Sequence, residues 1–229
     1  MAHAAVDILF ALFPGVTQLD FTGPHQVFSR LPGGSVTVAS VTGEPIEVEG
    51  FSFAGLRRLA DIAACDVLCV PGGAGTNAAM LDEVFLAELR RLAASARFVT
   101  SVCTGSLILG AAGLLVGRRA ACHWASRDLL ACFGAIPDAG RVVRDGNVIT
   151  GGGVTAGIDF ALGVAAEIAG DEAAQAIQLM IEYAPAPPFD AGRPETAPPA
   201  VLARVQRLMA SAAADRPAAV EAAASRLPG

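Results

Sequence analysis

Short runs of Val, Ile, Leu and Phe alternate along this chain with longer segments rich in Ala, Leu, Glu and Arg, and glycine-rich turns separate them. This alternation constrains the fold, because short apolar strands divided by helices pack as a mostly parallel sheet with helices on both faces. We therefore predict an α/β fold. The predicted strands span residues 6–12, 35–41, 66–70, 97–102, 119–122 and 148–150.

Three further segments have clear patterns. Residues 81–96 place Val84, Leu86, Leu89 and Leu92 at close to helical spacing, which predicts a helix packed on the surface of the core. Residues 44–53 and 141–153 alternate around glycine, and both predict β-hairpins added to the edge of the sheet. The Asp145-Gly146 pair gives the second hairpin the stronger turn signal.

The C-terminal part has a different composition. The prolines between Ala184 and Ala200 prevent regular ladders and helices, so this segment should run over the surface as an extended strap. We expect the core to end at Tyr183, and we divide the chain into an α/β domain over residues 1–199 and a helical tail over 200–229. The Ala-rich tail predicts one or two helices, which could pack on a second subunit.

Composition excludes several classes of function. The net charge of -6, the scattered Lys and Arg residues and an aromatic content of 6% argue against nucleic acid as a partner. The apolar run at 107–116 is shorter than the roughly 20 residues that a membrane span needs. The segment 6–13 lacks the positive residues and cleavage site of a signal peptide, and we interpret it as a strand.

The five cysteines are an odd number in a large apolar domain, which favours a reducing cytoplasm over a secreted disulfide framework. Their spacing lacks the paired motifs of zinc sites, so we expect no metal and no cofactor. We interpret four of them as buried apolar side chains, namely Cys65, Cys69, Cys122 and Cys132.

Cys103 lies where a predicted strand turns at once into a predicted helix, within the sequence Ser-Val-Cys-Thr-Gly-Ser. Ser101 and Gly105 lie two residues before and after it, as in a nucleophile elbow, where a sharp turn tolerates little bulk. Free amides at the helix start should favour the thiolate and stabilise an anion formed after attack. The alternative is that Cys103 is also a buried apolar residue; we favour the nucleophile.

Six motifs in order carry a family resemblance: LDFTGP, VPGGAGT, VTSVCTGSLILGAAGLL, HWAS, VRDGNVITGGGVTAGIDFAL and EYAPAPPFDAG. Over residues 6–199 the chain resembles the ThiJ/PfpI family of the class I glutamine amidotransferase-like superfamily, and among its branches it is most similar to isocyanide hydratases. The resemblance implies a flavodoxin-like sheet, a cysteine nucleophile and a homodimer.

The resemblance also implies roles for individual residues. Asp20, from the loop after the first strand, would lie beside Cys103 as the acid and base, although an aspartate there could instead cap a helix. The Thr104 hydroxyl could hydrogen-bond to Asp20. The amides of Gly73 and Thr104, with Gly72 in the same glycine turn, would form an oxyanion-hole-like site, although an ordinary tight turn also needs glycine.

Two other segments complete the expected site by resemblance. Gly152 and Val154 would line the substrate pocket, unless their turn serves only to start a helix. His123 could orient the thiol, although a histidine beside Trp124 at a strand end can also be purely structural. Thr104 occupies the position after the cysteine, where other family members place histidine.

The expected function is hydration of an organic isocyanide to an N-substituted formamide, by attack of Cys103 with assistance from Asp20. The family also contains glyoxalase-like enzymes, oxidative-stress proteins and sensor domains fused to DNA-binding modules. The tail is too short for such a DNA-binding module. A cysteine-based redox or glyoxalase-like role remains the alternative, since it needs only an accessible thiol of low pKa.

Overall fold

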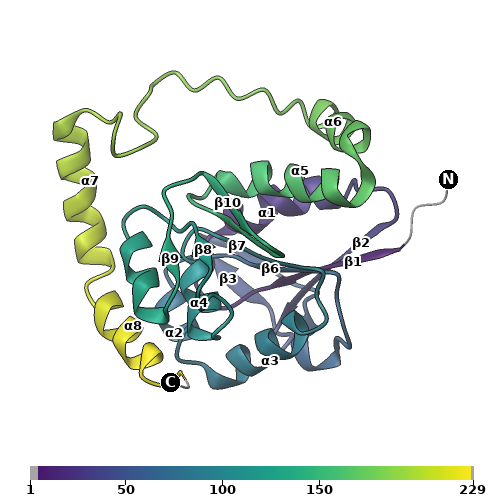
Figure 1. Cartoon of the computed structure of the whole chain (residues 1–229), viewed down its shortest axis with the longest axis horizontal. Coiled ribbons are helices and arrows are strands. Elements are labelled where there is room, and N and C mark those ends of the chain that lie inside the picture. The colour runs from purple at the N-terminus through teal and green to yellow at the C-terminus, as the bar shows by residue number, and fades with distance from the viewer. Residues whose placement is uncertain (1–4, 228–229) are drawn as a thin grey trace.

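The computed structural model describes residues 5–227 and forms one α/β unit around a seven-stranded sheet (Figure 1). The strands of this sheet are β1 (Val6–Ala11), β2 (Gly34–Ser40), β5 (Arg57–Arg58), β6 (Val67–Val70), β7 (Phe98–Val102), β10 (Val142–Asp145) and β11 (Val148–Gly151). Their order is β10-β11-β7-β6-β1-β2-β5, and only β10 runs antiparallel to its neighbour.

Helices cover both faces of the sheet, as the alternation of segments predicts. The α-helices are α1 (Gln18–Phe28), α2 (Thr76–Ala79), α3 (Glu83–Ala93), α4 (Gly105–Ala111), α5 (Ala156–Ala169), α6 (Asp171–Met180), α7 (Pro199–Ala212) and α8 (Arg216–Ala224). The 3-10 helices are η1 (Leu59–Asp61) and η2 (Arg127–Phe133). Helices α1, α5 and α6 lie on one face of the sheet, and α2, α3 and α4 lie on the other (Figure 1). The predicted fold class is confirmed.

The core is divided between the two faces by the two-residue period of the strands. Along β1, Ile8 and Phe10 pack under α1 and α5, whereas Leu9 and Ala11 point to the face covered by α3 and α4. Because both faces are covered, the central strands are apolar throughout rather than alternating.

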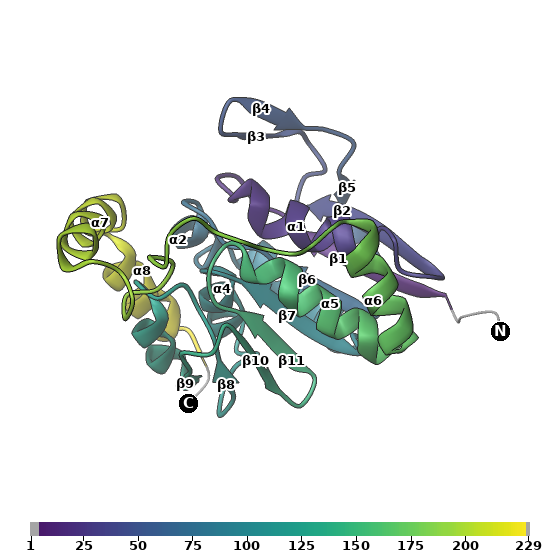
Figure 2. The same ribbon diagram turned by 90° about the horizontal axis from the view of Figure 1, so that it is seen from above.

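Two predicted β segments differ from the expectation. Residues 119–122 form only a two-residue strand, β8 (Arg119–Ala120), which pairs with β9 (Ile136–Pro137) in a small separate sheet. The 44–53 hairpin, β3 (Ile46–Val48) and β4 (Phe51–Phe53), also forms its own two-stranded sheet and projects from the domain (Figure 2). Only the hairpin of β10 and β11 extends the main sheet, as predicted.

The start of helix α3 is determined by its local sequence. Asp82 precedes the helix, and its carboxylate accepts hydrogen bonds from the amides of Val84 and Phe85, which would otherwise lack partners. The apolar stripe differs from the prediction in one position. Val84 is 61% exposed and Phe85 is buried in its place. Phe85 precedes Leu89 and Leu92 by four and seven residues and so shares their face of the helix, whereas Val84 lies on the adjacent polar face.

The sequence predicts that the core ends at Tyr183, but the core continues beyond this residue. After the proline-rich strap, helix α8 returns to the domain and packs on η2, α2 and α4 (Figure 1). Val220 is 1% exposed and belongs to the same buried cluster as α3 and α4. The boundary at residue 199 is therefore not a boundary of the core.

Helix α7 differs from α8, since none of its residues is buried. The exposed apolar side chains on it include Val201 and Leu208. Within residues 5–227, no helix combines the length and apolar character needed to cross a bilayer.

Candidate active site

The candidate site lies at the carboxyl ends of four adjacent strands, β1, β6, β7 and β11. Parallel strands present their following loops at one edge, where open α/β sheets bind ligands. The loop after β1 leads to Asp20, and the turn after β6 contains Gly72 and Gly73. Cys103 directly follows β7. The topology thereby brings together residues that are as many as 83 positions apart in sequence, counting from 20 to 103.

Cys103 forms the predicted elbow. Strand β7 ends at Val102, helix α4 begins at Gly105, and the backbone of Cys103 is left-handed, with φ of 57°. This conformation costs a residue with a side chain roughly 1–2 kcal/mol, so the surrounding structure must hold it. Gly105 is required because a Cβ there would lie 2.1 Å from the carbonyl oxygen of Val70.

The Cys103 thiol is buried, with only 6% of the residue exposed. Burial raises its pKa well above the ordinary value, and the neighbouring Asp20 carboxylate raises it further. The amide of Thr104 acts in the opposite direction, as expected at a helix start, but does not outweigh burial. Burial and the Asp20 carboxylate thus oppose the thiolate that the helix start was expected to favour.

Asp20 lies in the first turn of α1 and has no exposed surface. Its Oδ2 accepts a 2.9 Å hydrogen bond from the amide of Gly72. Asp20 does not cap α1, because Thr17 occupies the N-cap position. The carboxylate instead binds the turn that follows β6, near Cys103.

Burial raises the pKa of Asp20 to about 7, although its interactions with Gly72 and Cys103 act to lower it. The other carboxylate oxygen, Oδ1, is buried and makes no hydrogen bond of normal geometry with the residues described here. Oδ1 therefore remains available to accept a proton, and the Cys103 thiol lies near enough to affect the Asp20 pKa.

The sequence suggested a hydrogen bond from the Thr104 hydroxyl to Asp20, but the structure does not contain it. This hydroxyl accepts a 3.0 Å hydrogen bond from the amide of Gly73 and lies 2.8 Å from the Thr76 hydroxyl. The amides of Gly72 and Gly73 are thus both engaged within the protein. Neither can stabilise an anion without breaking these bonds, whereas the Thr104 amide faces Cys103.

The structure places Gly152, Val154 and His123 together in a neighbouring cavity of about 530 Å³. Cys122 also lines this cavity, but Cys103 and Asp20 do not. The wall of this cavity is joined to the elbow through the backbone, because the Cys103 amide donates a 3.0 Å hydrogen bond to the carbonyl oxygen of Gly151, the residue before Gly152. His123 is half-buried. Two effects lower its pKa, and burial is the larger of them, ahead of the positive charge of Arg216.

Sequence reasoning missed two groups at the elbow. Thr76 supports Thr104 from α2, and nothing in its sequence position indicates this contact. Ser106 is fully buried, lies 2.8 Å from the Ser101 hydroxyl and donates a 2.6 Å hydrogen bond to the carbonyl of Ala121. Two serines flanking a cysteine in an apolar segment were the available signal. These hydroxyls tie the elbow to the 121–126 loop.

The donor groups of the site are a thiol, a carboxyl group and hydroxyls. Across the described part of the chain, no three His, Cys, Asp or Glu side chains gather as a possible metal-binding group. The chemistry that these groups can perform is nucleophilic addition by sulfur, with the carboxyl group moving protons.

Comparison with known proteins places the fold and the elbow in a family. Residues 6–167 match the DJ-1/PfpI family. The chain belongs to the DJ-1/PfpI family. This DJ-1/PfpI protein is 51% identical to the isonitrile hydratase of Pseudomonas putida over 224 residues, which cover 97% of this chain and 98% of the relative. It is 29% identical to Drosophila melanogaster protein dj-1beta over 76% of its own length and 97% of that relative.

Solved structures agree with this assignment to the DJ-1/PfpI family. A ThiJ/PfpI family protein from Pseudomonas syringae superimposes with a TM-score of 0.89 at 42% identity, covering 97% of this chain and 92% of that one. Drosophila melanogaster DJ-1beta superimposes with a TM-score of 0.71 at 27% identity, covering 79% of this chain. The longer match with the first structure includes the strap and tail, which lie beyond residue 167.

Proposed function

We propose that this DJ-1/PfpI protein is an isocyanide hydratase, a lyase that adds water to an organic isocyanide and releases an N-substituted formamide. The P. putida relative bears the name isonitrile hydratase, a synonym for this activity, and aligns with nearly the whole chain. The observation that carries the proposal is the buried pair of Asp20 and Cys103, in which burial raises the pKa of the carboxyl group to about 7 and also raises the pKa of the thiol.

In the first step, the Cys103 sulfur attacks the terminal carbon of the isocyanide. Because burial raises the pKa of the thiol, its proton passes to the Asp20 carboxylate as the carbon–sulfur bond forms. Asp20 then delivers this proton to the same carbon, which gives a thioimidate. A carboxyl group with a pKa near neutrality suits both transfers, since it is neither too weak as a base nor too weak as an acid.

In the second step, water adds to the thioimidate carbon. Asp20 accepts one proton from the water and passes it to the nitrogen, which gives a tetrahedral adduct. The carbon–sulfur bond then breaks, the hydroxyl becomes the formamide carbonyl, and the hydroxyl proton returns through Asp20 to the sulfur. The thiol and the carboxylate are regenerated, and the net reaction consumes one isocyanide and one water.

The buried site also bears on the alternative functions. A redox sensor reacts through an exposed thiolate of low pKa, whereas Cys103 is 6% exposed and its pKa is raised. These properties favour the hydratase over the redox role. The proposal includes a homodimeric, cytoplasmic enzyme without cofactor, which follows from the family resemblance and the odd number of free cysteines.

The decisive experiment incubates the purified protein with an aryl isocyanide and measures the formamide by chromatography. We expect thiol-dependent turnover in the wild type and none in Cys103→Ala. Asp20→Asn preserves the shape of the side chain but removes proton transfer, and it should lower kcat by about 10²–10⁴-fold.

Cys132→Ala is the matched control, because Cys132 is an exposed free cysteine and not the buried side chain that the sequence predicted. It should retain full turnover. Formamide production that survives in Cys103→Ala would reject the hydratase mechanism. Full activity in Asp20→Asn would keep the reaction but remove Asp20 from it.

A further inference from the structure

Arg216, at the start of α8, is a buried cation outside the candidate active site. The residue is 8% exposed. Its Nε donates a 3.0 Å hydrogen bond to Asn77 Oδ1 in α2, and its Nη1 donates a 3.1 Å hydrogen bond to Ser126 Oγ. Both partners are neutral side chains, so these bonds hold the guanidinium in place without neutralising it.

The charge of Arg216 is therefore uncompensated. It takes part in none of the ion pairs formed by residues 5–227, and the adjacent Asp215 is exposed and forms no salt bridge with it. A guanidinium carries five N–H donors, and only two of them have partners among the described residues. Since arginines are almost never this buried unless they are paired, the arrangement indicates a missing anion.

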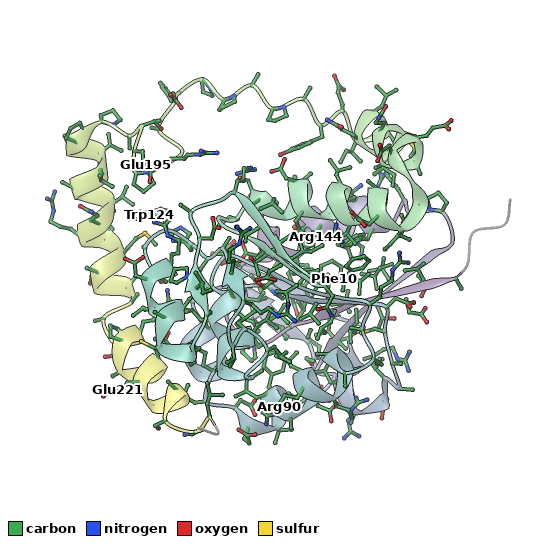
Figure 3. All side chains as sticks on the ribbon, viewed as in Figure 1. Phe10, Arg90, Trp124, Arg144, Glu195 and Glu221 are labelled. Carbon is green, nitrogen blue, oxygen red and sulfur yellow. The ribbon has the colours of Figure 1, made fainter. Side chains whose placement is uncertain are left out.

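A cavity of about 280 Å³ opens beside this guanidinium, between α7, α8 and η2. We call it the Arg216 pocket. Its walls contain no acidic residue, and apart from Ser126, Gln206 and Arg216 itself they are apolar: Trp124, Ala125, Leu129, Met209, Ala210, Ala213 and Pro217. Trp124 lies on the side of the domain that faces α7 (Figure 3).

We propose that the Arg216 pocket binds a small organic monocarboxylate, with the carboxylate on Arg216 and an apolar body against Trp124 and α7. The planar guanidinium matches a carboxylate in a two-point arrangement. A single cation with apolar walls suits one negative charge and a hydrophobic substituent, whereas a phosphate would bring a second charge without a partner. The cavity is large enough for a ligand of the size of benzoate.

The Arg216 pocket is connected to the candidate active site through the 122–126 loop. Ser126, which Arg216 contacts, donates its amide hydrogen bond to the carbonyl of His123 at 2.9 Å. Trp124 lines both the Arg216 pocket and the 530 Å³ cavity that contains His123. An anion on Arg216 should thus change the position and electrostatics of a loop that adjoins the elbow.

The test measures binding and so does not depend on hydratase activity. The intact protein is titrated with benzoate at low salt in a calorimeter, and with benzamide, which has the same shape but no charge. We expect saturable 1:1 binding of benzoate, with benzamide bound at least about tenfold more weakly. Arg216→Gln should abolish the preference, whereas Arg207→Gln, an exposed arginine on α7, should retain it.

A second variant covers the case in which Arg216→Gln fails to fold. Ala213→Phe keeps Arg216 but fills the Arg216 pocket from its α7 side, and it should also abolish benzoate binding. In the wild type, benzoate should raise the His123 pKa, followed by NMR of its imidazole, because neutralising Arg216 removes a charge that lowers it. Equal binding of benzoate and benzamide, unchanged binding in Ala213→Phe, or no binding of benzoate would overturn the proposal.

Discussion

The amide of Gly72 donates a 2.9 Å hydrogen bond to the Asp20 carboxylate and joins the turn after β6 to the first turn of α1. This bond holds a buried carboxyl group whose other oxygen, Oδ1, has no hydrogen-bond partner among the described residues. Gly72 has no space for a side chain, since a Cβ would lie 2.5 Å from both the Thr104 amide nitrogen and its hydroxyl oxygen. Gly72 thus binds the Asp20 carboxyl group through its amide and packs directly against Thr104, the residue after Cys103.

Asp20→Asn should stabilise the protein more at alkaline pH than at acid pH. The Asp20 pKa is about 7 in the folded protein and 3.8 in the unfolded chain. Between these values the folded state holds a proton that the unfolded state has lost, so the free energy of unfolding falls as pH rises through this window. One pH unit is worth about 1.4 kcal/mol, so the maximum loss is about 4 kcal/mol.

Urea unfolding of both proteins at about pH 4 and about pH 8 checks this prediction. The difference in free energy of unfolding between Asp20→Asn and wild type should be larger at the higher pH by a few kcal/mol. An unchanged difference across this range would show that Asp20 titrates normally in the folded protein.

Asp20→Asn should also make Cys103 easier to alkylate. The Asp20 carboxylate is one of the groups that raise the Cys103 pKa, so its removal lowers the pH at which the thiolate forms, although burial still keeps the pKa raised. The measurement is the rate of iodoacetamide labelling against pH, read by peptide mass spectrometry in a Cys132→Ala background, which removes the exposed competing thiol. A slower reaction in Asp20→Asn would contradict the assignment.

Gly105→Ala should destabilise the protein by more than about 3 kcal/mol or prevent folding, because its Cβ would collide with the carbonyl oxygen of Val70. Gly163→Ala is the matched control in helix α5, where the added Cβ meets no atom within 4 Å. It should raise stability by about 0.5–1 kcal/mol through helix propensity. Thermal unfolding compares the two variants, and equal stabilities would refute the steric account of the elbow.

Val220→Ala should lower the free energy of unfolding by about 2 kcal/mol, because it removes buried methyl groups from the core under α8. Val201→Ala makes the same change on the exposed side of α7 and should alter stability by less than about 0.5 kcal/mol. Chemical denaturation of both variants checks whether the tail is part of the cooperative fold. Similar small effects would mean that α8 docks independently.

The sequence was sufficient to predict the elements whose local pattern determines them. The central strands are buried on both faces, so their continuous apolar runs are visible without tertiary information. Cys103 was found because strand, small residues and helix start coincide there. The 44–53 hairpin was misplaced because alternation predicts a strand but not its partner. The error at Val84 arose because two adjacent apolar residues, Val84 and Phe85, compete for one place on the buried face of α3, and only Phe85 lies in line with Leu89.

The site was harder to predict because its properties depend on burial and on contacts between distant loops. A helix start favours a thiolate, but the cost of placing charge in the core determines the Cys103 pKa, and burial cannot be read from a motif. In the same way, no local pattern indicates that the Gly73 amide is occupied by Thr104. Nothing in the Ala-rich sequence of the tail indicates that Arg216 is buried.

The packing of α8 has a consequence for how the protein is made. Val220 and Ala223 leave the ribosome after η2 and α4, yet they complete the apolar layer that contains those helices. Until residues 216–224 have emerged, that layer faces water. The nascent chain therefore exposes a hydrophobic surface until α8 has emerged, and chaperones or neighbouring chains can bind this surface in the meantime.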